Sequence, residues 1–318
     1  MNCTRQSSPG FLVAACTLAL TLSGCSLEQI AIRRLSDALA GSATTFASDD
    51  DPELIRAAVP FSLKLIESLL EASPEHEGLL LAAASGFTQY SFAFVEQDAD
   101  ELVSRNLGAA EALRERARRL YRRARGHGLR GLEVRQPGLA ASLRADPRAA
   151  LKTTEVRDVP LLYWTAAAWG RSIALSKDEP DAVADQVIVE ALIDRALELD
   201  EGHGDGAIHA FMISYEMVRQ GAPGDPAGRA LGHFERAMEL SGGQEAGPLV
   251  ALAEAVAVQK QDVGLFRKLL AQALAIDPDA RRASRLGNLV MQRRARWLLS
   301  LTHELFVEPE PPVEKLKS

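Results

Sequence analysis

One short helical pattern recurs three times in the C-terminal half of this chain, and it constrains the fold more than any other feature. The copies are IDRALELD, FERAMELS and LAQALAID, which begin at Ile193, Phe234 and Leu270. Each has a bulky residue, an alanine three positions later, then Leu or Met. The alanines are 41 and 36 residues apart. A helical hairpin repeated at such intervals cannot bury its apolar face alone, so neighbouring hairpins must stack.

Composition agrees with an all-α chain. Alanine, leucine, arginine and glutamate dominate, and only 5% of the residues are aromatic. These are helix-forming proportions, and no period-two alternation predicts a strand. We expect an all-α fold of TPR-like helical hairpins stacked as an α-solenoid, although the spacing exceeds the period of about 34 residues of a strict tetratricopeptide repeat. Residues 126–160 depart from the pattern and are interpreted as an insertion.

The N-terminus predicts a lipoprotein signal peptide. Arg5 precedes an apolar stretch over residues 11–22, and LSGC ends at Cys25. The stretch is short for a bilayer span and suits a secretory signal, and the small residues before Cys25 resemble a bacterial lipobox. We expect residues 1–24 to be removed and Cys25 to be lipidated; an ordinary signal peptide or a buried helix is the alternative. Ser26 favours anchoring at the periplasmic face of the outer membrane.

The mature chain is expected to keep no thiol for a disulfide. The remaining cysteines, Cys3 and Cys16, lie in the segment that is removed. Stability must therefore come from packed apolar surface, despite an oxidising compartment.

The acidic residues 49–51 predict the start of a helix. Asp51 precedes Pro52, and aspartate before a first-turn proline is a typical helix N-terminus. A calcium loop would need alternating oxygen ligands and a turn glycine, which do not follow. Pro60 should kink or split this helix. One apolar stripe is predicted along it, formed by Leu54, Ala58, Phe61, Leu65 and Leu69.

Domain boundaries follow from these features. Residues 25–50 form the lipid-anchored segment, and residues 51–306 form the TPR-like helical domain. The Pro-rich and charged residues 307–318 are expected to be a disordered tail.

Enzyme chemistry has little support. The chain contains no HExxH, GxSxG or P-loop motif. His203, Asp205 and His209 lie close together at a glycine-rich turn, but no fourth ligand is evident, so we expect a surface turn rather than a metal site. We predict no catalytic residue, metal or cofactor. The net charge of −7 argues against a nucleic-acid partner.

Several segments together resemble a known family. They are the lipobox, the stretch LSDALAGSATTFASDDDPELIRAAVPFSLKLIESLL, then SPEHEGLLLAAASGFTQYSFAFV, and DVPLLYWTAAAWGRSIAL followed by RALELD. This order is similar to the T component of TRAP transporters (TatT), which are periplasmic TPR-type lipoproteins. The resemblance covers residues 22–306.

The resemblance implies an accessory role in transport. It implies a helical scaffold that docks a periplasmic solute-binding protein, the P component, and helps an apolar or amphipathic ligand to reach it. It also implies oligomerisation, with a trimer as the expected form. The alternative is a structural TPR scaffold for envelope assembly that acts only through protein contacts.

Three aromatic residues are candidates for a ligand cavity or an interface. Tyr163, Trp164 and Trp169 lie on one predicted helix. Trp164 and Trp169 are five positions apart, so their directions diverge by more than about 100° and they cannot easily share one core. Packing of all three in the core is the alternative.

An arginine-rich helix is the second candidate surface. It is expected to end at Gly126 and Gly128. A solvated face is the simplest interpretation, and an acidic docking partner, anionic lipid headgroups or a ligand carboxylate are the alternatives. The arginines are Arg114, Arg116, Arg118, Arg119, Arg122, Arg123 and Arg125. We take Arg114, Arg118, Arg122 and Arg125 as candidates for partner docking.

Overall fold

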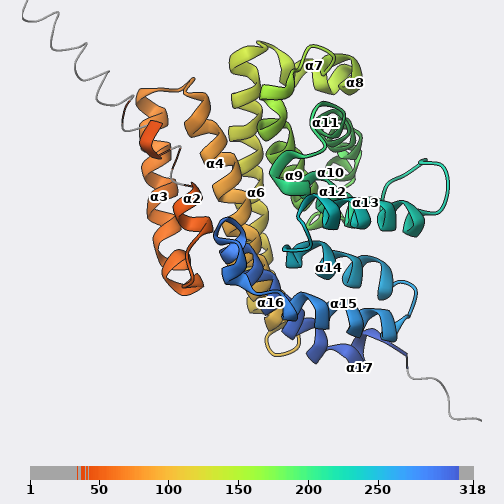
Figure 1. The fold of residues 1–318 in the computed structure, drawn as a ribbon. Helices are drawn as coiled ribbons and strands as arrows, with labels where there is room; N and C mark the ends of the chain where they lie inside the picture. Colours follow the sequence, from red (N-terminus) through yellow and green to blue (C-terminus); the bar gives the residue numbers. More distant parts are fainter. Residues whose placement is uncertain (1–33, 35–36, 40, 42, 308–318) are drawn as a thin grey trace, which may run out of the picture.

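The computed structural model describes residues 34, 37–39, 41 and 43–307. These residues form helices joined by turns, with no strand among them (Figure 1). The expected all-α class is confirmed for this part of the chain. The signal peptide, Cys25 and the expected tail beyond residue 307 lie outside the described residues.

The N-terminal helices pack as a layered group around α4 and α6. Apolar side chains from α3, α4 and α6 form one buried cluster between them. The group consists of α2 (Ala43–Ala47), α3 (Pro52–Ala72), α4 (Glu77–Tyr90), the π-helix η1 (Ser91–Glu96), α5 (Gln97–Leu102) and α6 (Leu107–Arg135).

The segment Glu77–Leu102, which joins α4, η1 and α5, is long and apolar enough to cross a membrane by length and composition. More than half of its apolar window is nevertheless buried inside the protein. Its residues Phe87, Tyr90 and Phe94 are buried against the neighbouring helices. This segment is therefore a core helix of the fold.

The start of α3 confirms the interpretation of the acidic residues. Asp51 is the N-cap, and its carboxylate accepts hydrogen bonds from the backbone N–H groups of Glu53 and Leu54, both at 3.0 Å. Pro52 occupies the first turn, where its missing N–H leaves no bond unmade. Pro60 lies inside α3 without splitting it, because the helix is continuous over 21 residues.

Replacing Asp51 by alanine should lower the free energy of unfolding by about 1 kcal/mol, since two N–H groups lose their acceptor. The matched control is Asp50→Ala, because the Asp50 side chain is exposed and, among the residues that the structure describes, caps no helix N–H group and forms an ion pair only with Arg285, at 3.4 Å. The control should change stability by less than about 0.5 kcal/mol. Urea unfolding of both variants measures the difference, and equal losses would contradict the capping role of Asp51.

The apolar stripe predicted on α3 is only partly buried: Ala58, Leu65 and Leu69 are half-buried, but its other two residues are exposed. Leu54 is 56% exposed and Phe61 is 74% exposed. The buried residues instead follow a second stripe, formed by Ile55, Leu63, Ile66 and Leu70. Both stripes have helical spacing, so the sequence pattern alone does not show which one is buried. The packing of α3 on α4 determines which stripe faces the core.

The predicted end of the arginine-rich helix is also wrong. The helix α6 continues through Gly126 and Gly128 to Arg135. Gly128 serves close packing instead of a C-cap: a Cβ there would lie 2.2 Å from Oγ1 of Thr165 on α9. A Cβ at Gly131 would lie 2.7 Å from Leu161 on the same helix. The missing side chains allow α6 and α9 to approach each other.

The rest of the predicted insertion and the segment after it form the middle of the molecule. A second buried cluster joins the end of α6 to α9, α11 and α12. The elements are α7 (Leu139–Ala145), α8 (Pro147–Ala150), the 3₁₀ turn η2 (Val156–Asp158), α9 (Val159–Ala174), α10 (Pro180–Ala184) and α11 (Gln186–Leu199).

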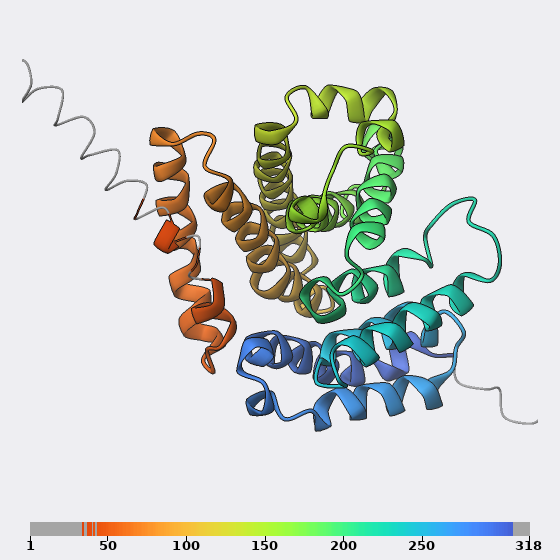
Figure 2. The same cartoon turned by 45° about the horizontal axis from the view of Figure 1, so that its top comes forward.

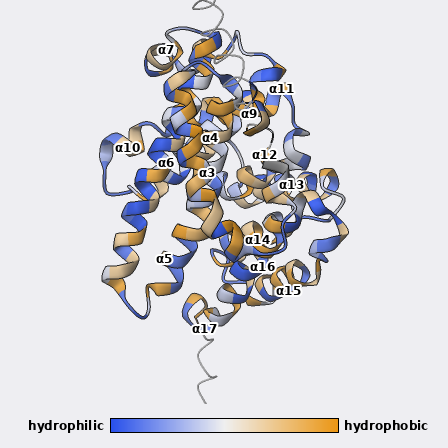
Figure 3. Cartoon of the chain, turned by 90° about the vertical axis from the view of Figure 1, so that its left-hand side faces the viewer, coloured by the Kyte–Doolittle hydropathy of each residue, from blue (hydrophilic) through white to orange (hydrophobic). Residues whose placement is uncertain are grey.

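The C-terminal helices enclose a third buried cluster, and Figure 3 shows hydrophobic residues concentrated on α14. The elements are α12 (His203–Tyr215), α13 (Pro226–Leu240), α14 (Ala246–Leu252), the π-helix η3 (Ala253–Ala257), α15 (Val263–Ala275), the 3₁₀ turns η4 (Pro278–Ala280) and η5 (Arg282–Ser284), α16 (Arg285–Ser300) and α17 (Thr302–Leu305).

The repeated pattern of the sequence falls on alternate helices. Its three alanines, Ala196, Ala237 and Ala273, lie on α11, α13 and α15, and all are buried. The small side chain permits close contact with the preceding helix: Gly206 on α12 approaches so closely that a Cβ there would lie 3.2 Å from Cα of Ala237. The motif therefore marks points of close helix packing.

The last long helix returns to the first ones. Figure 2 shows the blue C-terminal helices beside the orange N-terminal helices, and α16 contacts α2 and α3. Arg293 pairs with Asp98 at 2.7 Å and with Glu101 at 2.8 Å, both on α5. Arg294 pairs with Asp100 of α5 at 3.2 Å. These ion pairs tie the C-terminal part of the fold to the N-terminal part.

Candidate functional site

The helix α9 carries the three aromatic candidates on two different faces. The 3₁₀ turn η2, which leads directly into α9, is held by a capping box in which Glu155 and Asp158 accept from each other's backbone N–H groups. Trp169 is buried in the middle cluster, whereas Tyr163 and Trp164 are half-buried. The two tryptophans therefore diverge, as the helical geometry predicted. Their proposed ligand or interface role stays a prediction.

Trp169 is a core residue with polar partners at its edge. Its indole N–H donates to Oδ2 of Asp185 at 3.2 Å. The Arg125 guanidinium of α6 lies 4.6 Å from the ring centroid. Such a cation–π contact holds α6 against α9. Burial lowers the pKa of Arg125, and the Asp185 carboxylate opposes that shift.

Tyr163 and Trp164 form an aromatic group where α9 meets α12. Their rings pack edge to face, with centroids 4.9 Å apart, and the Tyr163 ring lies 5.5 Å from that of His203. Desolvation raises the pKa of Tyr163 to about 12, helped by the nearby Glu245 carboxylate. Tyr163 therefore stays a neutral hydrogen-bonding ring at any physiological pH.

One face of α9 continues from these rings to a charged residue, Arg171. The Arg171 guanidinium makes a bidentate ion pair with Glu96 of η1. Tyr121 of α6 donates to the same carboxylate at 2.6 Å. The Glu96 side chain is 4% exposed, whereas the Arg171 side chain is 36% exposed. The Arg171 guanidinium therefore contacts a buried carboxylate on one side and is open to water on the other. Its open side can bind a further anionic or polar group.

A second arginine, Arg294, also lies close to the Phe92 ring. The Arg171 guanidinium is 5.5 Å and the Arg294 guanidinium is 5.8 Å from the Phe92 ring centroid. Arg294 also donates to both carboxylate oxygens of Glu254 on η3, at 2.6 and 2.7 Å. Although desolvation opposes it, the Glu254 charge raises the pKa of Arg294.

The sequence analysis missed this charged group. Its carboxylates Glu96 and Glu254 sit on the two π-helices, η1 and η3. π-helical turns are rare and frequently occur at functional sites. The partners Glu96 and Arg171 are separated by 75 positions in the sequence. The only local signal is the pair of aromatic residues in SFAF, within η1.

The four docking candidates on α6 all have acidic partners within the chain. Arg114 pairs with Asp100 at 3.3 Å, and Arg122 pairs with Glu179 at 2.9 Å. Arg118 pairs with Glu115 and Glu179, and Arg125 lies 3.8 Å from Asp185. The arginines are thus a partly exposed, charge-compensated surface. An acidic partner would have to compete with the chain's own carboxylates.

Residues 48–306 match the protein family described as TRAP transporter T-component (TAtT). The chain belongs to the TRAP transporter T-component family. A relative of this T component comes from Treponema pallidum (strain Nichols) and carries the description "Uncharacterized protein". It is 27% identical over 319 residues, which cover 94% of this chain and 97% of the relative. The resemblance inferred from the sequence motifs is confirmed.

The matched region contains α3 to α17, and therefore Tyr163, Trp164, Trp169 and the α6 arginines. T components are transport accessories rather than enzymes, and membership implies an accessory role in TRAP transport. Cys25 lies outside both the matched region and the described residues.

The histidines of the predicted surface turn contact an aromatic ring and another histidine. In the described part of the chain, no three His, Cys, Asp or Glu side chains form a metal-binding group. His203 faces Tyr163, and His209 meets His233 of α13 with their Nδ1 atoms 2.8 Å apart. One of the two rings must donate this hydrogen bond and the other accept it, so at least one is neutral.

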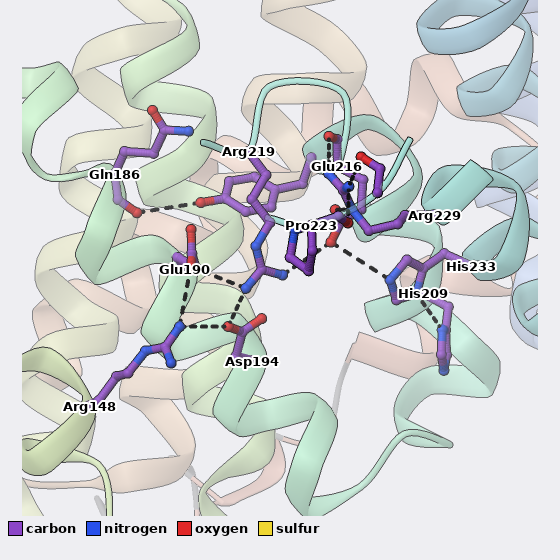
Figure 4. A network of polar contacts seen from close by, with 12 residues as sticks. Arg148, Gln186, Glu190, Asp194, His209, Glu216, Arg219, Pro223, Arg229 and His233 are labelled. Atoms are coloured by element: carbon purple, nitrogen blue, oxygen red, sulfur yellow. Dashed lines mark hydrogen bonds and ion pairs between the residues drawn. The ribbon is translucent and has the colours of Figure 1, made fainter. Parts of the chain in front are cut away.

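The histidine pair adjoins a partly buried ionic network that links α8, α11, α12 and α13 (Figure 4). Arg219 contacts Asp194 at 2.6 Å and Glu216 at 3.0 Å. Glu216 also accepts from Arg229 at 2.5 Å and lies 3.9 Å from His233. Because Glu216 is almost fully buried, its two arginine partners are needed to offset the desolvation of its charge.

The histidine pair should make the T component less stable in acid. Burial lowers the pKa of His209, although Glu201 opposes the shift; burial and the neighbouring His209 lower the pKa of His233. The unfolded chain, with a His pKa of about 6.5, therefore binds more protons near pH 6. This contribution to stability is complete above about pH 6.5 and is lost as the pH falls through the folded-state values.

Urea unfolding between pH 8 and pH 5 tests this expectation. The variant His233→Gln keeps a hydrogen-bonding side chain on α13 but removes one titrating ring. Its stability should decline less steeply with falling pH than that of the unchanged protein. Identical slopes would show that the pair does not set the acid sensitivity.

Proposed function

We propose that this protein is a lipid-anchored accessory of a TRAP-type transport system at the periplasmic face of the outer membrane. Family membership supports the transport role. The lipobox ending at Cys25 supports the anchor, and Ser26 supports the outer membrane as its location. The anchor would hold the helical domain close to the membrane while it meets a soluble partner.

We propose further that the protein docks the substrate-binding P component and passes an apolar or amphipathic ligand to it. The observation that carries this proposal is the half-buried face of α9. That face places the Tyr163 and Trp164 rings on the same helix as the partly exposed Arg171 cation. Aromatic rings with a few placed polar groups are typical of sites for small ligands.

The fold supports the proposal of a TPR-type solenoid. The repeated motif places a buried alanine on each of α11, α13 and α15, and α12 packs against α13 as α14 packs against α15. Stacked helix pairs of this kind offer extended surfaces for a protein partner. Assembly into a trimer stays part of the proposal.

A pull-down from native periplasmic extract tests the docking role. The bait is the chain with Cys25→Ser, which lacks the lipid anchor. We expect enrichment of one TRAP-type solute-binding protein, identified by mass spectrometry. Trp164→Ala should reduce that enrichment, whereas Phe61→Ala, which removes an exposed ring on α3, should not.

The arginine surface has its own matched pair of variants. Arg122→Ala should weaken capture if the α6 surface docks the partner, and Arg119→Ala, which breaks an exposed pair with Glu115, is the control. Recovery of envelope-assembly proteins without any solute-binding protein would contradict the transport role. That outcome would instead support the structural scaffold.

A further inference from the structure

An open groove of about 530 Å³ lies between α13, α14 and α15, away from the α9 face. Its size falls within the range of small-molecule sites, roughly 300–1,000 Å³. None of its lining residues belongs to the aromatic and charged group described above. They are Leu231, Phe234, Met238, Gly243, Leu249, Leu252, Leu265, Lys268, Leu269, Gln272 and Ile276.

The groove has an apolar floor and two apolar walls. Leu249 and Leu252 of α14 are buried and form the floor. The wall from α13 repeats an apolar residue at three- and four-residue steps. The α15 side contributes Leu265 and Leu269, four positions apart, and Ile276 just beyond the end of that helix. Leu231 at the rim is 45% exposed. A ligand covering this rim would gain hydrophobic free energy from surface that otherwise faces water.

The groove has a single charge, and it is positive. Lys268 and Gln272 are the polar side chains of the lining, one helical turn apart on α15. Within the described part of the chain, no carboxylate lies within ion-pair distance of Lys268, unlike the arginines of α6. An ammonium group beside an apolar groove complements a ligand with one anionic end and one long apolar part.

We propose that this groove binds a single-chain carboxylate amphiphile, such as a long-chain fatty acid. The hydrocarbon chain lies between α13 and α15 on the Leu249 and Leu252 floor. The carboxylate meets the Lys268 ammonium, and the Gln272 amide offers a second donor. This inference goes beyond the docking role, because the site shares no residue with the α9 face. Ligand binding here and capture of a P component can therefore succeed or fail separately.

Fluorescence titration tests the proposal. The protein is the chain with Cys25→Ser, and the probe is a conjugated-tetraene fatty acid whose emission rises in apolar surroundings. We expect saturable binding that Lys268→Glu weakens by about tenfold through charge reversal. Lys260→Glu makes the same charge change at an exposed lysine outside the groove and should leave affinity unchanged.

The apolar walls are tested in the same way. Leu231→Glu should weaken binding by about tenfold, because it places a charge at the apolar rim. Val187→Glu is the control, since Val187 is an exposed valine on α11 outside the groove. Thermal melting of each variant shows that it remains folded.

The methyl ester of the same probe distinguishes the contribution of the carboxylate charge from that of the hydrocarbon part of the ligand. The ester should bind the unchanged protein more weakly than the acid does. Its affinity should be the same for the unchanged protein and for Lys268→Glu, because the ester carries no charge. No saturable binding, or binding that all variants share, would overturn the site. An acid affinity unaffected by Lys268→Glu but lost in Leu231→Glu would overturn the carboxylate as the recognised group.

Discussion

Replacing Arg171 by alanine is expected to destabilise the protein by about 3–5 kcal/mol, because it leaves the Glu96 carboxylate buried without a cation. Glu96 is 4% exposed, and Tyr121 alone would remain as its partner. The reverse change should cost less. Glu96→Gln keeps a side chain of similar shape and leaves a guanidinium that water already reaches, so we expect a loss of about 1–2 kcal/mol.

Urea unfolding at pH 7 measures both losses. Arg122→Ala provides the matched arginine control, because both side chains of the Arg122–Glu179 ion pair are exposed to solvent. The control should cost less than about 1 kcal/mol. If Glu96→Gln cost as much as Arg171→Ala or more, the burial of the carboxylate would not be the main cause of the lost stability. The contacts of the Arg171 side chain, rather than the buried charge of Glu96, would then be the main source of stability at this face.

The second large effect separates the two tryptophans of α9. Trp169→Ala should cost about 3–5 kcal/mol, because it leaves a cavity where a buried ring was and removes the indole N–H that donates to Asp185. Trp164→Ala removes a half-buried ring outside the core clusters, and should cost roughly 1 kcal/mol. For a domain of this size, each kcal/mol lowers the melting temperature by about 2–4 °C.

Thermal unfolding combined with the pull-down gives the decisive comparison. Trp164→Ala should retain nearly the full melting temperature while losing capture of the P component. Trp169→Ala should lose stability first, and any loss of capture would follow from that. Equal destabilisation by the two changes would assign Trp164 to the core and remove it from the proposed interface.

Local features of the fold could be predicted from the sequence because short-range physics decides them. The N-cap at Asp51 needs only the residues that follow it, and the buried alanines of α11, α13 and α15 follow from their repeated spacing. Packing decided the features that were predicted wrongly. A glycine at position 128 is compatible with a helix C-terminus and with close packing of a second helix. The close approach of Thr165 on α9 shows that Gly128 serves close packing.

The candidate site was predictable in part for the same reason. Helical geometry separates Trp164 from Trp169 without any knowledge of the fold. By contrast, Glu96, Arg171 and Arg294 come from distant parts of the chain, and their meeting depends on how the helices stack. The π-helical turns that carry Glu96 and Glu254 leave no periodic signal in the sequence.

The contacts of α16 with the N-terminal helices limit how many helical hairpins such a protein can gain or lose. An open stack of helical hairpins can gain or lose a unit at its free end, because each unit contacts only its neighbours. Here the end is occupied: Arg293 and Arg294 bind carboxylates of α5. Duplicating a hairpin would carry α16 away from these partners and remove the ion pair that Arg293 makes with Glu101 of α5. The number of hairpins is therefore fixed by the closure of the chain on itself.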